Sequence, residues 1–421
     1  MTYYILPKNN SALQINPEKQ LISNGFKEII SVSVKRHYDN LTSQITNIVN
    51  QKDICNLFSE KHDTHKINKI LTEASQITNP LEYIFSNIPN QNYSISKMKC
   101  THNIFYELIE IFASCNIVDN PCIGSFLNFT ALDTEDFNFI LKNESIIITN
   151  HSSPICEYIY NHLVNTRVSE IGTSATIGTS ATIGDSLSGY LYDIMVFDLN
   201  TTGLTNNPSS SFVAHYFQEC IYILFIILKC QRTNGSSVIK ISNATYQLEL
   251  DFIYLLNSLY EKVYILKPSS SSLTNSDKYI VCKHFSKQHS SHLVDPIKQI
   301  VVSFIQDLMH PSPFPEKTCT NSLLSIQLPY YFIIKMEEIN SIIGQQQLDG
   351  LSQIINIVKQ KHRDDKLETV YRNNICKCMQ WCEKHQVPYN KVYEKHNIFA
   401  QTTIKNTFSS SLALPLAESS Y

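Results

Sequence analysis

Two charged residues stand where an apolar β-strand ends or continues, and both could take part in proton-transfer chemistry. Asp198 lies near the end of the run Tyr192–Leu199, and Lys240 lies inside the run Ser237–Ile241. Lysine is rarely buried unless it is paired or functional, and ligands of open α/β sheets bind beyond the carboxyl ends of the strands. This placement favours a reaction site. The alternatives are a solvated loop aspartate and an edge-strand lysine that faces water.

A glycine turn earlier in the chain could hold a ligand. The short apolar run Asn116–Asp119 ends in an acid and leads through Gly124 into an apolar stretch that reaches Leu132. A strand, a glycine turn and a helix in this order direct backbone N–H groups at a ligand. A plain connection between two elements is the alternative interpretation of a single glycine.

The elements that must position these residues alternate between strands and helices from about residue 100 to 285. Beyond the two strands above, the expected elements are a strand at Ser145–Thr149 and helices at Ile104–Phe112, Glu157–Val164, Phe212–Lys229 and Leu248–Leu259. Two further strands, Val263–Leu266 and Tyr279–Cys282, flank a polar loop and predict an antiparallel hairpin. The pattern predicts an α/β fold with a mostly parallel sheet and an antiparallel edge.

The loop of this hairpin reads KPSSSSLTNSDKY from Lys267 to Tyr279. It resembles the C-terminal hairpin of FtsJ-like ribose 2'-O-methyltransferases, in the divergent form of large cytoplasmic DNA viruses. That family has Lys-Pro-x-Ser-Ser-Arg and then Asn-Ser-Glu-x-Tyr; here Ser272 replaces the Arg and Asp277 replaces the Glu. The resemblance covers under half of the chain. It implies a Rossmann-like S-adenosylmethionine methyltransferase sheet that ends in the hairpin.

The resemblance also implies a catalytic tetrad of the order Lys-Asp-Lys-Glu. Asp198 matches the tetrad Asp, Lys240 matches the second Lys, and Asp277 replaces the Glu. The second Lys is the general base in such a site. We therefore expect burial and the other lysine to lower the pKa of Lys240, because an unperturbed lysine is protonated at neutral pH.

The first tetrad lysine should lie in the helix before the cofactor-binding strand. Counting back three residues from Glu110 puts Glu107 at this position, and counting back from Glu107 puts Ile104 there. Neither register supplies a lysine. Lys97 or Lys99 in the preceding loop could reach in instead.

S-adenosylmethionine is the cofactor, and RNA the substrate, that the resemblance implies. Ile123-Gly124-Ser125-Phe126 aligns with the family's Pro-Gly-Gly-Phe and would lie against the cofactor. The expected cofactor-binding residues are Asp119, Gly124, Ser125, Phe126 and Asp198.

Two functions remain open at this point. The first is an S-adenosylmethionine-dependent 2'-O-methyltransferase that acts on RNA, in particular the mRNA cap. The second is a degenerate methyltransferase fold that serves as an RNA-binding or assembly subunit of a viral transcription or capping complex. An unrelated α/β protein is a third alternative, which the order of the hairpin, Asp198 and Lys240 disfavours.

Length and composition bound the rest. With 421 residues, we expect helical regions at 1–95 and 291–400 around a methyltransferase domain at 96–290, and a disordered tail at 401–421. A net charge of −3 argues against a strongly basic coat for nucleic acid, but not against a local basic groove. The most apolar segment, Cys220–Leu228, is too short for a membrane span and predicts a buried helix.

Cysteine usage indicates the compartment. Twelve cysteines without a signal peptide favour reduced thiols in a cytoplasmic setting, either host cytoplasm or virion if the protein is viral. Four potential zinc ligands lie close together in one segment that we expect to be helical: Cys376, Cys378, Cys382 and His385. Structural zinc sites pair distant ligands, so we expect no metal here.

Overall fold

The computed structural model describes residues 2–8, 13, 15, 29–50, 64–89, 91–118, 123–143, 145–151, 155, 157–159, 191–199, 210–242, 244–309, 322–359 and 364–390. The chain forms two compact units: Met1–Ser43 with Ile104–Asp349, and Gln44–Asn103 with Gly350–Tyr421. This division differs from the linear domains expected from the sequence, because the N-terminal and C-terminal segments each contribute to both units. The expected tail at 401–421 lies outside the described residues.

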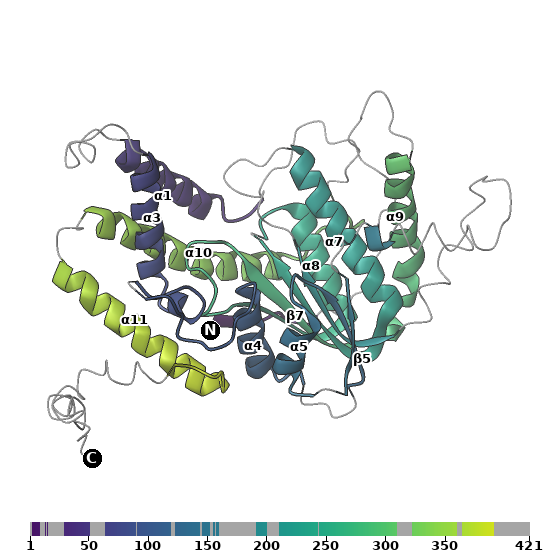
Figure 1. Cartoon of the computed structure of the whole chain (residues 1–421). Helices are drawn as coiled ribbons and strands as arrows, with labels where there is room; N and C mark the ends of the chain where they lie inside the picture. The colour runs from purple at the N-terminus through teal and green to yellow at the C-terminus, as the bar shows by residue number, and fades with distance from the viewer. Residues whose placement is uncertain are drawn as a thin grey trace, which may run out of the picture. The chain divides into compact units, whose positions relative to one another are not determined.

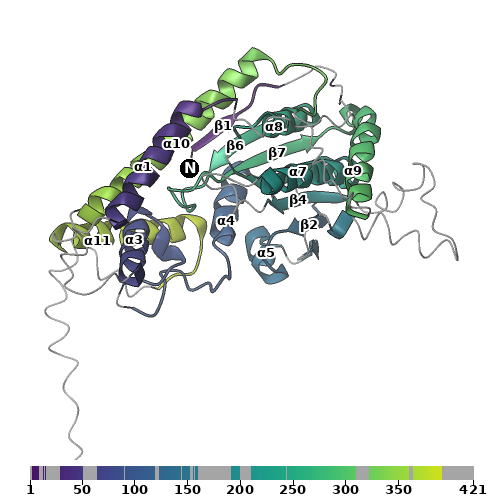
Figure 2. The ribbon, with the colours of Figure 1, turned by 90° about the horizontal axis from the view of Figure 1, so that it is seen from above.

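A seven-stranded mixed sheet forms the centre of the first unit (Figures 1 and 2), in the order β1-β6-β7-β5-β4-β2-β3. Its strands are β1 (Thr2–Ile5), β2 (Ser125–Phe129), β3 (Ile147–Asn150), β4 (Tyr192–Asp198), β5 (Gln231–Ile241), β6 (Tyr260–Lys267) and β7 (Lys278–Phe285). The four strands β3, β2, β4 and β5 are mutually parallel, whereas β7 runs antiparallel to both β5 and β6. The predicted Rossmann-like α/β sheet that ends in an antiparallel hairpin is confirmed.

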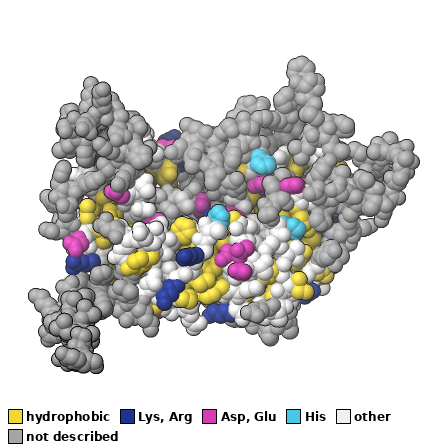
Figure 3. Space-filling model, in the orientation of Figure 1, with side chains coloured by type: hydrophobic (Ala, Val, Ile, Leu, Met, Phe, Trp, Pro, Cys, Tyr) yellow, Lys and Arg dark blue, Asp and Glu magenta, His cyan; other side chains and the backbone are white. Residues whose placement is uncertain are grey.

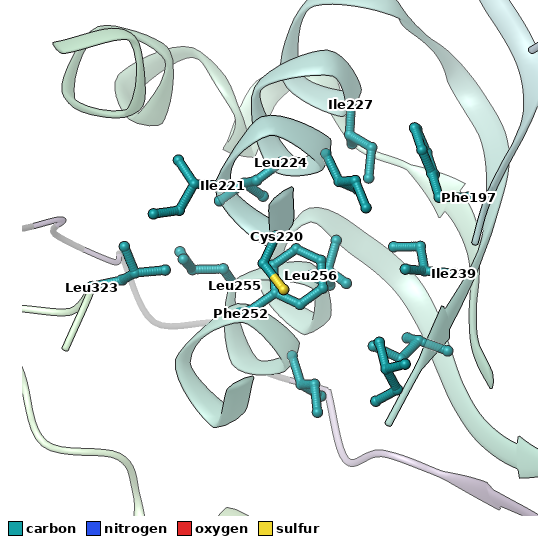
Figure 4. Packing of buried hydrophobic residues seen from close by; sticks show 14 of the residues in the cluster. Phe197, Cys220, Ile221, Leu224, Ile227, Ile239, Phe252, Leu255, Leu256 and Leu323 are labelled. Atoms are coloured by element: carbon teal, nitrogen blue, oxygen red, sulfur yellow. The ribbon is translucent and has the colours of Figure 1, made fainter. Parts of the chain in front are cut away.

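The two faces of the sheet bury different layers of helices. Leu127 and Phe129 of β2 belong to the large apolar cluster built with α7 (Ser210–Cys230) and α8 (Gln247–Leu259). Phe126 points the other way, since side chains alternate along a strand. It packs against Phe112 of α4 (Ile104–Cys115) and Phe137 of α5 (Thr134–Leu141). Figure 4 shows part of the α7–α8 layer, with Phe197 and Ile239 from the sheet.

The middle of helix α7 is continuously apolar and is covered on all sides. Residues 220–228 are buried, as expected from the sequence. One side packs on the sheet, and Tyr222 makes an edge-on ring contact with Phe304 of α9 (Val294–Met309). No helix in the described part of the chain has the length and apolarity to cross a membrane.

The N-terminal strand β1 was not expected from the sequence. It pairs antiparallel with β6, with Thr2 opposite Lys267 and Ile5 opposite Tyr264. Its sequence, Thr-Tyr-Tyr-Ile, lacks the strict alternation of polar and apolar side chains by which half-buried strands are recognised. The predicted helical N-terminal region is therefore wrong for its first residues.

The described parts of the second unit are helices joined by irregular segments, with an isolated antiparallel bridge between Ser96 and Tyr389. This unit contains α3 (Thr64–Thr78), the short 3-10 helix Glu82–Ile84 and α11 (Asp364–His385). Asn374 donates a hydrogen bond of 2.8 Å to the Ile77 carbonyl and so ties α11 to α3. Two long helices, α1 (Val32–Asn50) and α10 (Tyr330–Lys359), are divided between the two units.

Candidate active site

Asp198 and Lys240 lie side by side at the carboxyl ends of adjacent parallel strands. Asp198 is the last residue of β4 and its Cα partner on β5 is Lys240. Ile239 and Ile241 point into the α7–α8 layer, so the alternation of side chains directs Lys240 to the face that α4 covers. We call this end of the parallel strands the carboxyl edge.

A cluster of charges surrounds the Lys240 ammonium group. Its Nζ lies 3.6 Å from Glu107 Oε2 on α4 and 3.6 Å from Asp277 Oδ2 in the hairpin loop. Tyr279, opposite Lys240 on β7, donates a short hydrogen bond from its hydroxyl to Glu107 Oε2. The side chain of Lys240 is only 15% exposed, so solvent screens these interactions little. The structure thus brings Asp198, Lys240 and Asp277 to one place.

The pKa of Lys240 is shifted in the direction opposite to the one expected from the sequence. Burial alone would lower the pKa of Lys240, but the carboxylates of Glu107, Asp198 and Asp277 outweigh it and raise that pKa above its usual value. The prediction of a lowered pKa assumed a second lysine beside Lys240. The helix supplies Glu107 instead, so the ammonium form is stabilised.

The position of Glu107 depends on a contact between Glu110, one turn further along α4, and the hairpin loop. The carboxylate of Glu110 accepts hydrogen bonds of 3.0 Å and 3.1 Å from the backbone N–H groups of Ser269 and Ser270 in the hairpin loop. This anchor fixes the rotation of α4, which turns Glu107 toward the hairpin as well. Glu107 therefore occupies the place expected for the first tetrad lysine. Lys97 and Lys99 belong to the second unit.

A second buried lysine in this cluster escaped the sequence analysis. Lys267, at the end of β6, is 3% exposed and donates from Nζ to the carbonyl and side-chain oxygens of Asn275. Asn275 Nδ2 in turn donates a 3.0 Å hydrogen bond to Asp277 Oδ2. Burial lowers the pKa of Lys267 to about 8, with Asp277 and Glu107 opposing the shift and Lys240 adding to it. In the sequence, Lys267 appeared only as the lysine of the Lys-Pro pair that opens the hairpin loop, with no role in the site.

The predicted cofactor turn lies at the wrong end of its strand. Gly124 comes before β2, and the N–H groups of Gly124 and Ser125 donate to Asp193 Oδ2 at 2.9 Å and 3.0 Å. Asp193 also forms a 2.8 Å ion pair with Arg232. Asp198 is five residues further along β4, about 16 Å away at the rise of a strand. Gly124 and Ser125 therefore lie at the amino ends of the parallel strands, opposite the carboxyl edge where Asp198 lies.

The other two residues of that prediction also change. Phe126 is a core residue that packs between α4 and α5, and Asp119 lies outside the described residues. The error has a simple cause: the apolar stretch after Gly124 was interpreted as the helix that follows a turn. It is the strand itself.

The strand–turn–helix unit that reaches the carboxyl edge is formed by β2, residues 130–133 and α5. Asn128 Oδ1 accepts 2.8 Å hydrogen bonds from the backbone N–H and the hydroxyl of Thr130. Asp133 caps α5 by accepting a 3.0 Å hydrogen bond from the Asp136 N–H. The turn contains no glycine, and its own side chains satisfy these N–H groups.

The position of Gly124 outside the carboxyl edge can be tested by measuring the free energy of unfolding of glycine variants. We expect Gly124→Ala to change the free energy of unfolding by less than about 0.5 kcal/mol, the usual range for surface substitutions. An added Cβ would meet only Asp193 Oδ2, at 4.0 Å. Gly235→Ala is the matched comparison, because its Cβ would lie 2.1 Å from Gln231 Nε2 and 2.8 Å from two backbone oxygens. It should cost about 1–3 kcal/mol. Urea unfolding of both variants measures this difference, and equal losses would contradict our placement of Gly124.

Comparison with known proteins adds an independent observation. No family model matches the chain. The chain is 24% identical over 179 residues to cap-specific mRNA (nucleoside-2'-O-)-methyltransferase 2 of Pongo abelii. The aligned region covers 41% of this chain and 21% of that protein. It is 25% identical over 132 residues to cap-specific mRNA (nucleoside-2'-O-)-methyltransferase 1 of Leishmania braziliensis, 31% of each chain.

A solved structure of Haemonchus contortus phosphoethanolamine N-methyltransferase 2 with S-adenosyl-L-methionine aligns with a TM-score of 0.24 at 8% identity, over 44% of this chain and 39% of that one. The matched segments span about a fifth to a third of the curated relatives. Over its matched region, the chain is thus similar at low identity to cap-specific mRNA 2'-O-methyltransferases.

Proposed function

We propose that this protein is an S-adenosylmethionine-dependent RNA ribose 2'-O-methyltransferase that acts on the cap region of mRNA. The observation that carries the proposal is the convergence of Asp198, Lys240 and Asp277 at the carboxyl edge, where α/β sheets bind their ligands. The similarity to cap-specific methyltransferases supports the substrate class. A viral origin and a cytoplasmic location remain part of this proposal.

The charge of the carboxyl edge suits the cofactor. S-adenosylmethionine carries a cationic sulfur and a cationic amino group, and when bound it supplies an electrophilic methyl group. The edge presents the three carboxylates of Glu107, Asp198 and Asp277 and the two amines of Lys240 and Lys267. Such an excess of negative charge attracts a cation. The described residues therefore fit the cofactor by charge and by their position on the sheet.

The chain's own residues define how a hydroxyl proton would be handled. Lys240 is the amine nearest Glu107 and Asp277, and it accepts a proton only after losing its own. The acids around it raise its pKa, so the neutral amine is the minor form at neutral pH. Tyr279 holds Glu107 in place by hydrogen bonding. We therefore expect methyl transfer to become faster as the pH rises.

Glu107→Gln tests this order of events. Removing the negative charge should lower the pKa of Lys240, because Glu107 is the largest of the charges that raise it. The pH–rate profile for methyl transfer should move to lower pH, with a higher rate at pH 7 than in the unsubstituted protein. Glu135→Gln, which removes an exposed acid of α5, is the control that should not move the profile. An unchanged profile in Glu107→Gln would exclude Lys240 as the base.

A second function is favoured by two specific observations. Glu107 replaces the first tetrad lysine, and residues 130–133 after β2 contain no glycine and are closed by their own hydrogen bonds. Both features suit a methyltransferase fold that has lost catalysis and serves as an RNA-binding or assembly subunit of a transcription or capping complex.

Cofactor binding separates the two functions. We would titrate S-adenosylmethionine into the full chain by calorimetry, and then assay methyl transfer to capped RNA. RNA that already carries the 2'-O-methyl group is the control substrate. Micromolar binding with methylation of the unmodified RNA alone would support the enzyme. Absence of binding up to millimolar cofactor would favour the non-catalytic subunit.

A further inference from the structure

A separate pocket opens at the other end of the sheet. It has a volume of about 480 Å³ and lies where β5 and β6 begin and β7 ends. Its lining includes Lys8, Asn234, Glu261, His284 and Lys287. Asn234 is six residues before Lys240 on β5, so the pocket is about 20 Å from the candidate active site.

Tertiary hydrogen bonds fix the backbone on both sides of this pocket. Just before Lys8, the Leu6 N–H donates to the Val263 carbonyl at 2.9 Å, and the Pro7 carbonyl accepts from buried Asn257 at 2.7 Å. Next to Lys287, the Ser286 N–H donates to the Leu259 carbonyl at 2.9 Å. The two lysines therefore extend from anchored chain segments that are far apart in the sequence.

The pocket is polar and carries more positive than negative groups. Lys8 and Lys287 face one acid, Glu261, and the imidazole of His284 adds a hydrogen-bond donor. Among the described residues, the side chains of Lys8, His284 and Lys287 form no hydrogen bond or ion pair. Basic and acidic side chains are interspersed over the described surface in Figure 3 and the whole chain has a net charge of −3, so this excess of positive charge is local.

Backbone conformation sets two residues of this pocket apart. His284 and Asn234 have φ angles of 63° and 65°, in the left-handed region that non-glycine residues rarely adopt. Such conformations cost about 1–3 kcal/mol for a residue such as histidine and are concentrated at binding sites. Both residues line the pocket.

We propose that this pocket binds a phosphate group of a nucleotide or of an RNA strand. A pocket of this volume can hold a ligand of nucleotide size. Lysine ammonium groups are common phosphate ligands. The phosphate site itself rests on the pocket alone. Its occupation by RNA also rests on the proposed function, since a strand bound at the active site would have to extend along the sheet.

The test compares two double variants of the full chain that lose the same charge. Lys8→Ala/Lys287→Ala removes the two ammonium groups of the pocket. Lys377→Ala/Lys384→Ala removes two exposed lysines of α11 and is the control. Fluorescence anisotropy of a labelled single-stranded RNA decamer gives its affinity from 50 to 200 mM salt, and calorimetry gives the affinity for ATP. Circular dichroism checks that each variant is folded.

We expect the pocket variant to bind RNA roughly tenfold more weakly than the control variant at low salt. Its dependence of log affinity on log salt should be shallower by about 1.4, the value for two single-strand phosphate contacts. A loss confined to ATP would assign the site to a free nucleotide. Equal affinities of both variants for RNA and for ATP would overturn the proposal. None of these results depends on methyl transfer, so a failure of the proposed enzyme would be seen separately.

Discussion

Lys240→Ala is expected to lower methyl transfer to capped RNA by about 10²–10⁴-fold, the range for loss of a general base. Lys240 is the amine in contact with both Glu107 and Asp277, and the substitution removes that proton acceptor. Lys262→Ala is the matched control, because Lys262 is an exposed lysine on β6. Single-turnover assays with labelled S-adenosylmethionine measure the effect. Full activity in Lys240→Ala would exclude this residue from the chemistry.

The same substitution has a structural consequence that must be measured beside it. Without Lys240, the carboxylates of Glu107 and Asp277 lose the ammonium between them, and breaking a buried ion pair costs about 3–5 kcal/mol at most. Glu107 keeps its hydrogen bond from Tyr279 and Asp277 keeps its hydrogen bond from Asn275, so we expect a smaller loss and a folded protein. Lys240→Gln keeps hydrogen-bonding capacity and should show the same loss of methyl transfer with less destabilisation. Activity in Lys240→Gln with inactivity in Lys240→Ala would indicate a structural role for this residue.

Lys278→Met is expected to have the largest effect on the pH dependence of stability. Lys278 begins β7, is 3% exposed, and donates a 2.7 Å hydrogen bond to Asn340 on α10. Burial lowers its pKa to about 7, although Glu249 opposes the shift. In the unfolded chain its pKa is about 10.4. The unfolded state therefore binds the extra proton between these two values.

The sign of the effect follows from this difference. Where the unfolded state binds more protons, stability rises with pH, so Lys278 should add up to about 4 kcal/mol between pH 7 and pH 10. Buried cysteines such as Cys282, whose pKa is raised, act in the opposite direction above about pH 8.5. Subtracting the curve of Lys278→Met from that of the unsubstituted protein removes their contribution.

Urea unfolding at pH 6.5, 7.5 and 8.5 gives these curves. The unsubstituted protein should gain stability relative to Lys278→Met by roughly 1 kcal/mol per pH unit above pH 7. Lys262→Met, on an exposed part of β6, should leave the difference flat. A constant difference between the unsubstituted protein and Lys278→Met would mean that Lys278 keeps its proton in the folded state.

The sequence by itself determined several elements of the sheet and its helices, and two of the central charges. Alternating apolar runs were enough to locate β4, β7 and α8, because local patterns of burial are written in consecutive residues. An acid at the end of one strand and a lysine inside the next were also visible directly. Their convergence followed from the rule that parallel strands end on the same edge of a sheet.

Only the tertiary structure decided which groups surround Lys240. The opposition of Glu107 to Lys240 depends on the rotation of α4, which a contact between Glu110 and residues about 160 positions away sets. The role of Lys267 depends on the loop folding back so that Asn275 reaches both Lys267 and Asp277. Such contacts join distant segments and leave no periodic signal in the sequence.

The position of Gly124 is another feature that the sequence alone did not decide. A glycine between two apolar runs is compatible with a turn at either end of a strand, and the sequence does not say which run is the strand. The pairing of β2 with β4, Phe126 opposite Ile194, puts Gly124 beside Asp193 instead of Asp198. Strand register is a long-range property, because hydrogen bonds between segments about 70 residues apart fix it.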